Sequence, residues 1–166
     1  MNTIATNVGA DGTIVGVGSS TGVGFDGFLL QNDTFVPVEL SGSSIVFQEP
    51  TDIAAELVVG GYSDNLGVHG YMRGRQNTFH TIDCPGATGG VFLSGIDPVG
   101  RMLGGMTTAD GHQHGVMVSG GTCIAVDFPG STASHVNSIN GRGDIVGRYT
   151  DPSGHTHAFV VEHFLE

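Results

Sequence analysis

Apolar residues in this chain occur in short runs of about five to seven positions, separated by Gly, Pro, Asp and Asn. The runs are rich in Val, Ile, Phe and Tyr, which are residues typical of strands. No apolar spacing of three to four residues, as an amphipathic helix would require, competes with this pattern. The pattern therefore predicts a chain built from short β-strands joined by turns.

The runs recur with a period of about 44 residues. The first run of each unit is centred on a glycine, and these glycines, 44, 44 and 43 positions apart, are Gly16, Gly60, Gly104 and Gly147. A second run begins about ten residues later, at Asp26, His69, His114 and His157. A third run ends in an acid and a turn, with the acids at Glu39, Asp83 and Asp127. A weaker fourth run leads into the Gly-centred strand of a unit, at 4–8, 93–97 and 136–141.

Four short strands in about 44 residues, with apolar residues on both faces, are typical of a β-propeller blade. We therefore expect an all-β fold: a small β-propeller-like ring of four antiparallel repeats, forming a single repeat domain over 1–166. Its units are expected at roughly 1–43, 44–87, 88–131 and 132–166. The fourth unit lacks the acid-Pro-Gly run. We expect either residues 2–7 to close the ring against the last unit or a neighbouring chain to complete it, as a homo-oligomer.

Two segments carry a resemblance to a known family. They are Asp144-Ile-Val-Gly-Arg-Tyr-x-Asp-x-x-Gly-x-x-His-Ala-Phe159 and Phe79-x-x-Ile-Asp-x-Pro-Gly86. This pattern resembles the bacterial extracellular repeats named HAF after their His-Ala-Phe triplet, and the resemblance covers nearly all of the chain. It implies a secreted, propeller-like repeat protein, extracellular or periplasmic, and no particular activity. The first unit departs from the pattern, with Asp26 in place of His and Glu39 before Leu-Ser-Gly.

Composition narrows the function further. The chain has 16 acidic and 5 basic residues and a formal net charge of -11, which disfavours nucleic acid as a partner. All five basic residues are Arg, so chemistry that needs a lysine is excluded. No apolar run reaches the length of a membrane span, and residues 1–7 do not have the pattern of a signal peptide. Residues Leu165 and Glu166 are compatible with a cloning remnant.

Three histidines at one repeat position are the main chemical candidates. In a closed four-unit ring, His69, His114 and His157 with Asp26 would lie at equal radius, as a site for a divalent transition metal requires. The favoured alternative is structural: a histidine that recurs once per blade, beside large apolar residues, bonds a neighbouring backbone group or Asp. If the protein is an enzyme, the candidate catalytic residues are His114, His157 and Arg148.

Other positions depart from the repeat. His112 and His155 each lie two residues before a repeat histidine, after a turn, and with Arg142 they are candidate ligand-binding residues on loops. Arg148 stands where the other units have Val17, Gly61 and Gly105. We expect it to be buried near the ring interior, and a buried Arg needs an anionic partner, either a local acid or a ligand.

The remaining candidates favour structural roles. Glu39, Asp83 and Asp127 precede turns and are expected to cap them, as are Asp64 and Asp151. Cys84 and Cys123 align five positions apart within equivalent strands. We expect them to point to opposite faces and therefore not to form a disulfide.

Two function classes remain open. The first is a non-catalytic extracellular binding module for a carbohydrate, a surface component or another protein. The second is a metal-assisted hydrolase or lyase with a His-rich site on the ring axis. The absence of a Gly-x-Ser-x-Gly motif disfavours one common class of hydrolase. We favour the binding module, because the candidate residues stand mostly at positions that the repeat itself explains.

Overall fold

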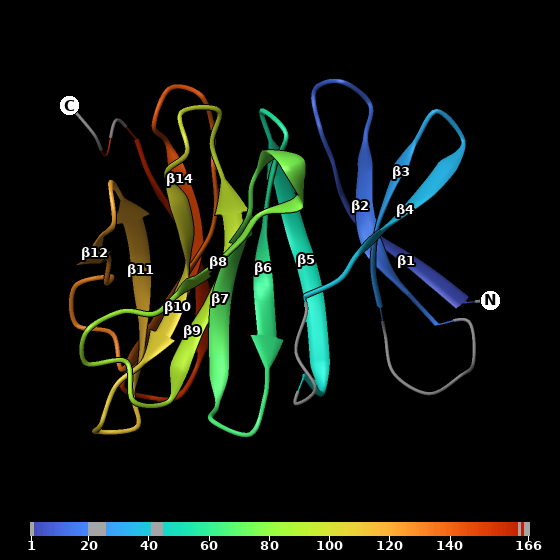
Figure 1. The fold of residues 1–166 in the computed structure, drawn as a ribbon. Helices are drawn as coiled ribbons and strands as arrows, with labels where there is room; N and C mark the ends of the chain where they lie inside the picture. Colours follow the sequence, from blue (N-terminus) through green and yellow to red (C-terminus); the bar gives the residue numbers. More distant parts are fainter. Residues whose placement is uncertain (1, 20–25, 41–44, 163, 165–166) are drawn as a thin grey trace.

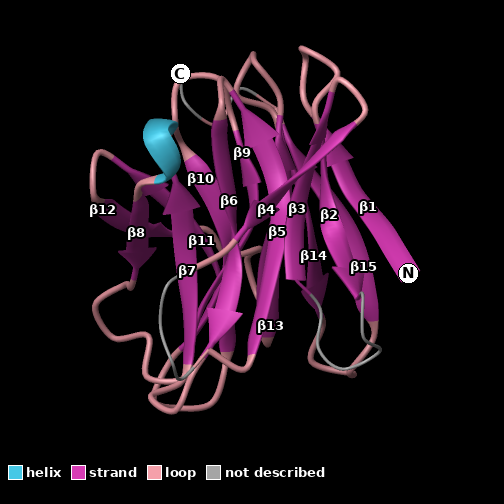
Figure 2. Cartoon of the chain, turned by 45° about the vertical axis from the view of Figure 1, so that its right-hand side comes forward, coloured by secondary structure: helices cyan, strands magenta, loops and turns pink. Residues whose placement is uncertain are grey.

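A computed structural model describes residues 2–19, 26–40, 45–162 and 164 of the chain. It confirms the all-β prediction: the described residues form fifteen strands in four antiparallel sheets (Figure 1). Their one helical element is a 3₁₀ turn, η1 (Arg75–Asn77), beside β8 (Figure 2). Ser41 and Gly42 of the third predicted run, and Leu165 and Glu166, lie outside the described residues.

Within each sheet the strands are hydrogen-bonded to one another in chain order. The first sheet contains β1 (Asn2–Val8), β2 (Ile14–Ser19), β3 (Asp26–Gln31) and β4 (Thr34–Val38). The second contains β5 (Phe47–Ala54), β6 (Leu57–Ser63), β7 (Val68–Arg73) and β8 (Phe79–Ile82). The third contains β9 (Gly90–Ile96), β10 (Met102–Thr107), β11 (Gln113–Ser119) and β12 (Thr122–Ala125). The fourth has three strands, β13 (Ala133–Ile139), β14 (Ile145–Thr150) and β15 (Thr156–Val161).

The four repeat glycines are structurally equivalent, as the period predicts. Each lies in the second strand of its sheet, opposite a β-bulge in the first strand. A Cβ at any of them would collide with a carbonyl oxygen of that first strand, at Ile4, Glu49, Phe92 and His135 respectively. Only glycine fits such a close approach of two backbones, which is why the residue recurs once per sheet.

The sheets pack face to back in chain order, so that each has a back face toward the preceding sheet and a forward face toward the next. In Figure 1 the first three sheets follow one another across the molecule from blue through green to yellow-brown, and the orange-to-red fourth sheet overlaps the third in this view. Val15 and Leu29 of the first sheet pack against the second. Val59 and Met72 of the second pack against the third, and Leu103 and Met117 of the third pack against the fourth. The described residues make no extensive contact between the first and fourth sheets.

The first strands of successive sheets also contact one another, and polar side chains connect them. The bulge residue Thr6 donates a hydrogen bond of 2.7 Å to the carbonyl of Pro50, and Thr51 donates one of 2.9 Å to the carbonyl of Leu93. Buried Asp52 accepts the side-chain amide of Asn7 at 2.7 Å and the backbone N–H of Ile96 at 2.9 Å. Three sheets are thus linked through one carboxylate.

The prediction that residues 2–7 pair with the last unit is wrong. These residues belong to β1, which forms a hairpin with β2 in the first sheet. The turn between them is closed by a hydrogen bond from Gly9 N to Thr13 O and capped by Asp11, which accepts the backbone N–H and the hydroxyl of Thr13. A short turn of this kind brings neighbouring strands together at little entropic cost, so the local pairing is preferred.

The structure also corrects the prediction for the cysteines, because Cys84 and Cys123 form a disulfide. Cys84 follows β8 in the second sheet, and Cys123 lies in β12 of the third. The inference that opposite faces exclude a bond fails for sheets stacked face to back. A residue on the forward face of one sheet meets a residue on the back face of the next, so positions on opposite faces of equivalent strands are the ones that come together.

Candidate functional site: a pocket beside the third sheet

The structure does not bring His69, His114, His157 and Asp26 together. Each of the three histidines instead contacts an acid of its own sheet: His69 Nδ1 lies 2.8 Å from Asp83, His114 Nδ1 lies 2.8 Å from Asp127, and His157 Nε2 lies 2.8 Å from Asp151. The described residues contain no group of three or more His, Cys, Asp or Glu side chains placed to hold a metal ion. The structural interpretation of the repeat histidines therefore agrees with the observed contacts.

The repeat histidines are only partly buried: the side chains of His69, His114 and His157 are 17%, 31% and 45% exposed. They stand near the start of the third strand of each sheet, on the face toward the preceding sheet, which covers them only in part. Asp83 and Asp127 are not simple turn caps, because each accepts a hydrogen bond from the histidine of the same unit.

The prediction of turn caps is confirmed for the other pair of acids. Asp64 accepts the backbone N–H groups of Leu66 and Gly67, and Asp151 accepts those of Ser153 and His155. Each of these acids also lies beside the Nε2 atom of the repeat histidine, Asp64 at 3.4 Å from His69 and Asp151 at 2.8 Å from His157. In the second and fourth units the turn acid thus occupies the Nε2 side of the imidazole.

The third unit departs from this arrangement. Thr108 stands where the second and fourth units have Asp64 and Asp151, and its hydroxyl donates to Asp110 two residues further on. His114 keeps its bond from Nδ1 to Asp127, but its Nε2 has no hydrogen-bond partner among the described residues. The loss of one turn acid therefore leaves an imidazole nitrogen of His114 available.

His112 is oriented in a similar way. Its Nδ1 lies 2.9 Å from the carbonyl oxygen of Thr132. A carbonyl can only accept, so the Nδ1 of His112 carries the proton. The same holds for His114, whose Nδ1 faces a carboxylate. In their neutral forms both rings therefore present an unprotonated Nε2, which is a hydrogen-bond acceptor.

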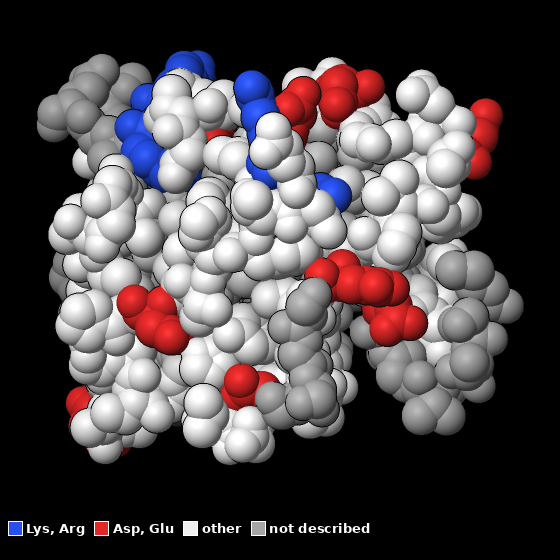
Figure 3. All heavy atoms as spheres, in the orientation of Figure 1, with Lys and Arg blue, Asp and Glu red and all other residues white. Residues whose placement is uncertain are grey.

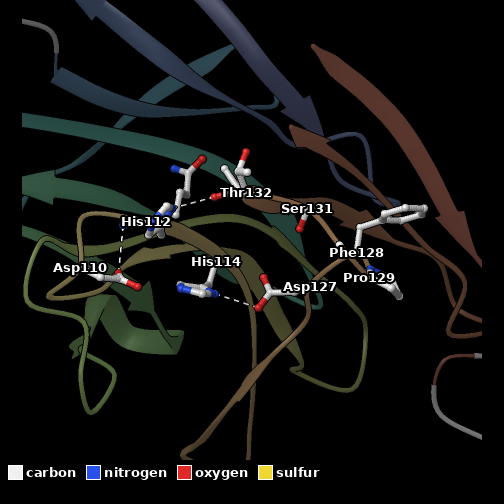
Figure 4. Close-up of a pocket in the computed structure, with 11 residues that line it drawn as sticks. Asp110, His112, His114, Asp127, Phe128, Pro129, Ser131 and Thr132 are labelled. Atoms are coloured by element: carbon white, nitrogen blue, oxygen red, sulfur yellow. Dashed lines mark hydrogen bonds and ion pairs between the residues drawn. The ribbon is translucent and has the colours of Figure 1, made fainter. Parts of the chain in front are cut away.

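These two histidines line a pocket of about 450 Å³ between the third sheet and the segment that leads to the fourth. Figure 4 shows His114 bonded to Asp127 on one side and His112 bonded to Thr132 above it. The lining is completed by Asp110, Gln113 and the segment 127–133, which includes Pro129. The ring of Phe128 is stacked on Tyr149 and points away from the two histidines (Figure 4). The pocket thus combines a polar wall rich in acceptors with one apolar residue, Pro129.

The electrostatic setting of the pocket is acidic. The hydroxyl of Thr108 and the backbone N–H of His112 stabilise the charged form of Asp110 and lower its pKa below the usual value. Four of the five arginines lie at or near the opposite end of the sheets, and blue side chains gather along one edge of the face in Figure 3. Three of them form ion pairs there: Arg75 with Glu56, Arg101 with Asp97 and Arg142 with Asp144. The pocket is therefore unsuited to an anion.

The other predicted ligand residues do not join the pocket. His155 is exposed in the turn between β14 and β15, and Arg142 is exposed in the turn between β13 and β14, at the other end of β14. Arg148 is exposed, contrary to the expectation of burial, and its side chain makes no ion pair with the described residues. Its sheet is the last of the four, so no following sheet covers that face. Asp26 lies on the first sheet, where it lines a separate hollow with Glu39.

Sequence reasoning missed part of this site. The repeat marks Pro129 and Gly130 as a turn after Asp127, but it does not indicate that the connection 128–133 lines a pocket. Thr108 and Asp110 carried a usable signal, since the alignment of the units shows Thr108 replacing a turn acid. A second missed contact lies nearby: buried His135, which replaces Phe92 of the preceding unit, has its Nε2 2.8 Å from the hydroxyl of Ser94.

Comparisons with known proteins do not assign the chain: no family model matches it, and no curated protein sequence does. Among the described residues, no helix has the length and apolar character needed to cross a membrane.

Proposed function

We propose that this chain is a non-catalytic extracellular repeat module that binds a carbohydrate in the pocket formed by His112, His114 and Asp127. One observation carries the proposal: two neighbouring imidazoles are held by their Nδ1 atoms so that both Nε2 acceptors are available beside the carboxylates of Asp110 and Asp127. Sugar hydroxyls donate to such acceptors, and Pro129 adds an apolar residue to the lining.

The acidic side chains around the pocket favour binding of a neutral ligand rather than a phosphate or other anion.

The disulfide between Cys84 and Cys123 supports an extracellular or other oxidising compartment, because such bonds are rare in reducing compartments. We also propose that the four sheets are successive blades of a propeller-like arrangement of the HAF repeat type, open between the first and fourth sheets. The successive contacts of β1, β5, β9 and β13 support an axis lined by the first strands. No contact among the described residues favours the alternative, a metal-assisted hydrolase or lyase.

Calorimetric titration against a panel of neutral oligosaccharides tests this function. We expect at least one saccharide to bind, and His114→Ala to weaken its binding about tenfold or more, the effect of losing one or two hydrogen bonds to a ligand. Thr108→Asp should weaken it similarly, because the new carboxylate restores the turn acid of the other units and covers Nε2 of His114.

The matched control is His155→Ala, which removes an exposed histidine from the neighbouring sheet without touching the pocket. We expect it to bind as the wild type does. Failure of every saccharide to bind, or equal affinity of the wild type and Thr108→Asp, would exclude the proposed role of the pocket.

A further inference from the structure

The last sheet exposes a face that the other three sheets cover. The residue before each repeat glycine points to the forward face, and in the first three sheets it is fully buried: Val15, Val59 and Leu103. Its counterpart in the fourth sheet, Val146, is 42% exposed. The cross-strand partners of these residues show the same contrast, since Leu29 and Met117 are buried while Val160 is 63% exposed.

The first sheet exposes the complementary face. At one back-face position the later sheets have Ile53, Ile96 and Ile139, all buried against the preceding sheet. The counterpart in β1 is Val8, which is 60% exposed. Ile4, the counterpart of partly buried Phe92 and buried His135, is 56% exposed. The stack therefore ends in two apolar faces, each of which has the residue pattern of one half of an internal interface.

We propose that the forward face of the fourth sheet binds the back face of the first sheet of a second copy of this chain. The contact continues the interface that already occurs three times within the chain, with Val146 and Val160 in the places of Leu103 and Met117. Val8 of the second copy takes the place of Ile139. Repeat units of this kind are stabilised by contacts with their neighbours, so an uncovered terminal face favours a further unit.

The polar part of the internal interface has a counterpart at this contact. In the first two sheets the bulge residues Thr6 and Thr51 donate to a carbonyl of the next first strand. The equivalent residue of the fourth sheet is Asn137, which is exposed and carries an amide donor. In the second copy the matching acceptor is the carbonyl of Ala5, the counterpart of Pro50 and Leu93 by strand register.

One position differs from the internal interfaces. Gly61 and Gly105 lie beneath the rings of Phe92 and His135 in the next sheet. The fourth sheet has Arg148 here, and the opposing residue of the second copy is Ile4. Arg148 is longer than the glycines of the internal interfaces, and Ile4 is smaller than the rings of Phe92 and His135. The methylene groups of an arginine pack well on an apolar side chain.

Because the contact is head to tail, two copies can bind each other twice and close a ring of eight sheets.

Light scattering coupled to size-exclusion chromatography, over a range of concentrations, tests the proposal. We expect the wild type to reach twice the mass of one chain. Val146→Glu and Val8→Lys should each raise the dissociation constant at least tenfold. Mixing the two variants should restore association, because each has one intact face and the altered faces carry opposite charges. Leu66→Glu and Val99→Glu are matched controls, since both replace exposed apolar residues of turns outside the two faces.

A single-chain mass for the wild type at all concentrations would overturn the proposal. So would variants that do not associate when mixed, or a dimer that Val146→Glu or Val8→Lys leaves intact. A dimer that survives Val8→Lys is the behaviour of copies joined edge to edge through β15, because that contact does not use the first sheet. Circular dichroism of each variant separates loss of association from loss of fold. Saccharide binding at the third sheet does not depend on these faces, so this proposal and the proposed function fail independently.

Discussion

The two middle sheets and the two end sheets are built from one repeat but are held in place differently. The second and third sheets are covered on both faces and joined by the disulfide between Cys84 and Cys123. The first and fourth sheets are covered on one face, and their outward positions include exposed Val8, Val146 and Val160. The comparison shows that the same apolar position stabilises the fold or forms a surface according to whether another sheet follows.

The histidine and acid contacts show the same effect of context. In the second sheet His69 lies between Asp64 and Asp83. Burial of the His69 ring lowers its pKa, but the hydrogen bond and charge of Asp83 outweigh burial, so the pKa lies above its usual value. In the third sheet the replacement of the turn acid by Thr108 releases Nε2 of His114 into a pocket. A single substitution in the repeat thus converts a structural contact into a candidate binding site.

The largest expected effect concerns the connection between the middle sheets. The disulfide closes a loop with a sequence separation of 39 residues, and a cross-link of that length contributes about 4 kcal/mol to the free energy of unfolding in the chain-entropy model. Reduction should lower the urea midpoint accordingly. The double variant Cys84→Ser, Cys123→Ser should match the reduced wild type. An unchanged midpoint would mean that the disulfide adds nothing to the packing of the middle sheets.

The repeat made much of the fold predictable from the sequence. Periodic glycines located the second strand of each sheet, because close approach to the bulged first strand forbids any side chain there. The cysteine pairing was not predictable in the same way. It depends on which face of one sheet meets which face of the next, and this is a property of the stack rather than of a single strand.

The candidate site was predictable only in part. His112 and His114 were identified from their spacing, but their hydrogen-bond partners were not. Asp127, which bonds His114, follows the β11–β12 hairpin, and Thr132, which bonds His112, lies in the connection to the fourth sheet. Arg148 was expected to be buried because its counterparts are. Its exposure follows from the absence of a covering sheet over its forward face, which the pattern of one strand does not reveal.

The second prediction compares the two kinds of sheet at one repeat position. Leu103→Ala should lower the free energy of unfolding by about 3 kcal/mol, since it leaves a cavity beneath the fourth sheet. Val146→Ala, at the equivalent position of the last sheet, should cost less than about 1 kcal/mol at concentrations where the chain is a monomer. Urea denaturation of both variants measures the difference. Equal losses would show that the outward face of the fourth sheet is covered in the monomer.

The third prediction concerns pH and the interface between the third and fourth sheets. Burial of His135, assisted by the nearby charge of Arg148, lowers the pKa of this imidazole to about 4. In the unfolded chain the pKa is close to 6.5, so the unfolded state binds a proton first as pH falls. His135 therefore makes the protein less stable as pH decreases from about 6.5 toward 4. Between pH 7 and pH 5 the loss amounts to about 2 kcal/mol.

The variant His135→Phe isolates this contribution. The equivalent pair in the preceding sheets, Phe92 over Gly61, shows that a phenyl ring fits opposite a glycine at this position. Other groups, such as His69 with its raised pKa, titrate in both proteins and cancel in the difference. We expect the stability advantage of His135→Phe over the wild type to grow as pH falls from 7 to 5. A constant difference across that range would mean that His135 takes up its proton without leaving the interface.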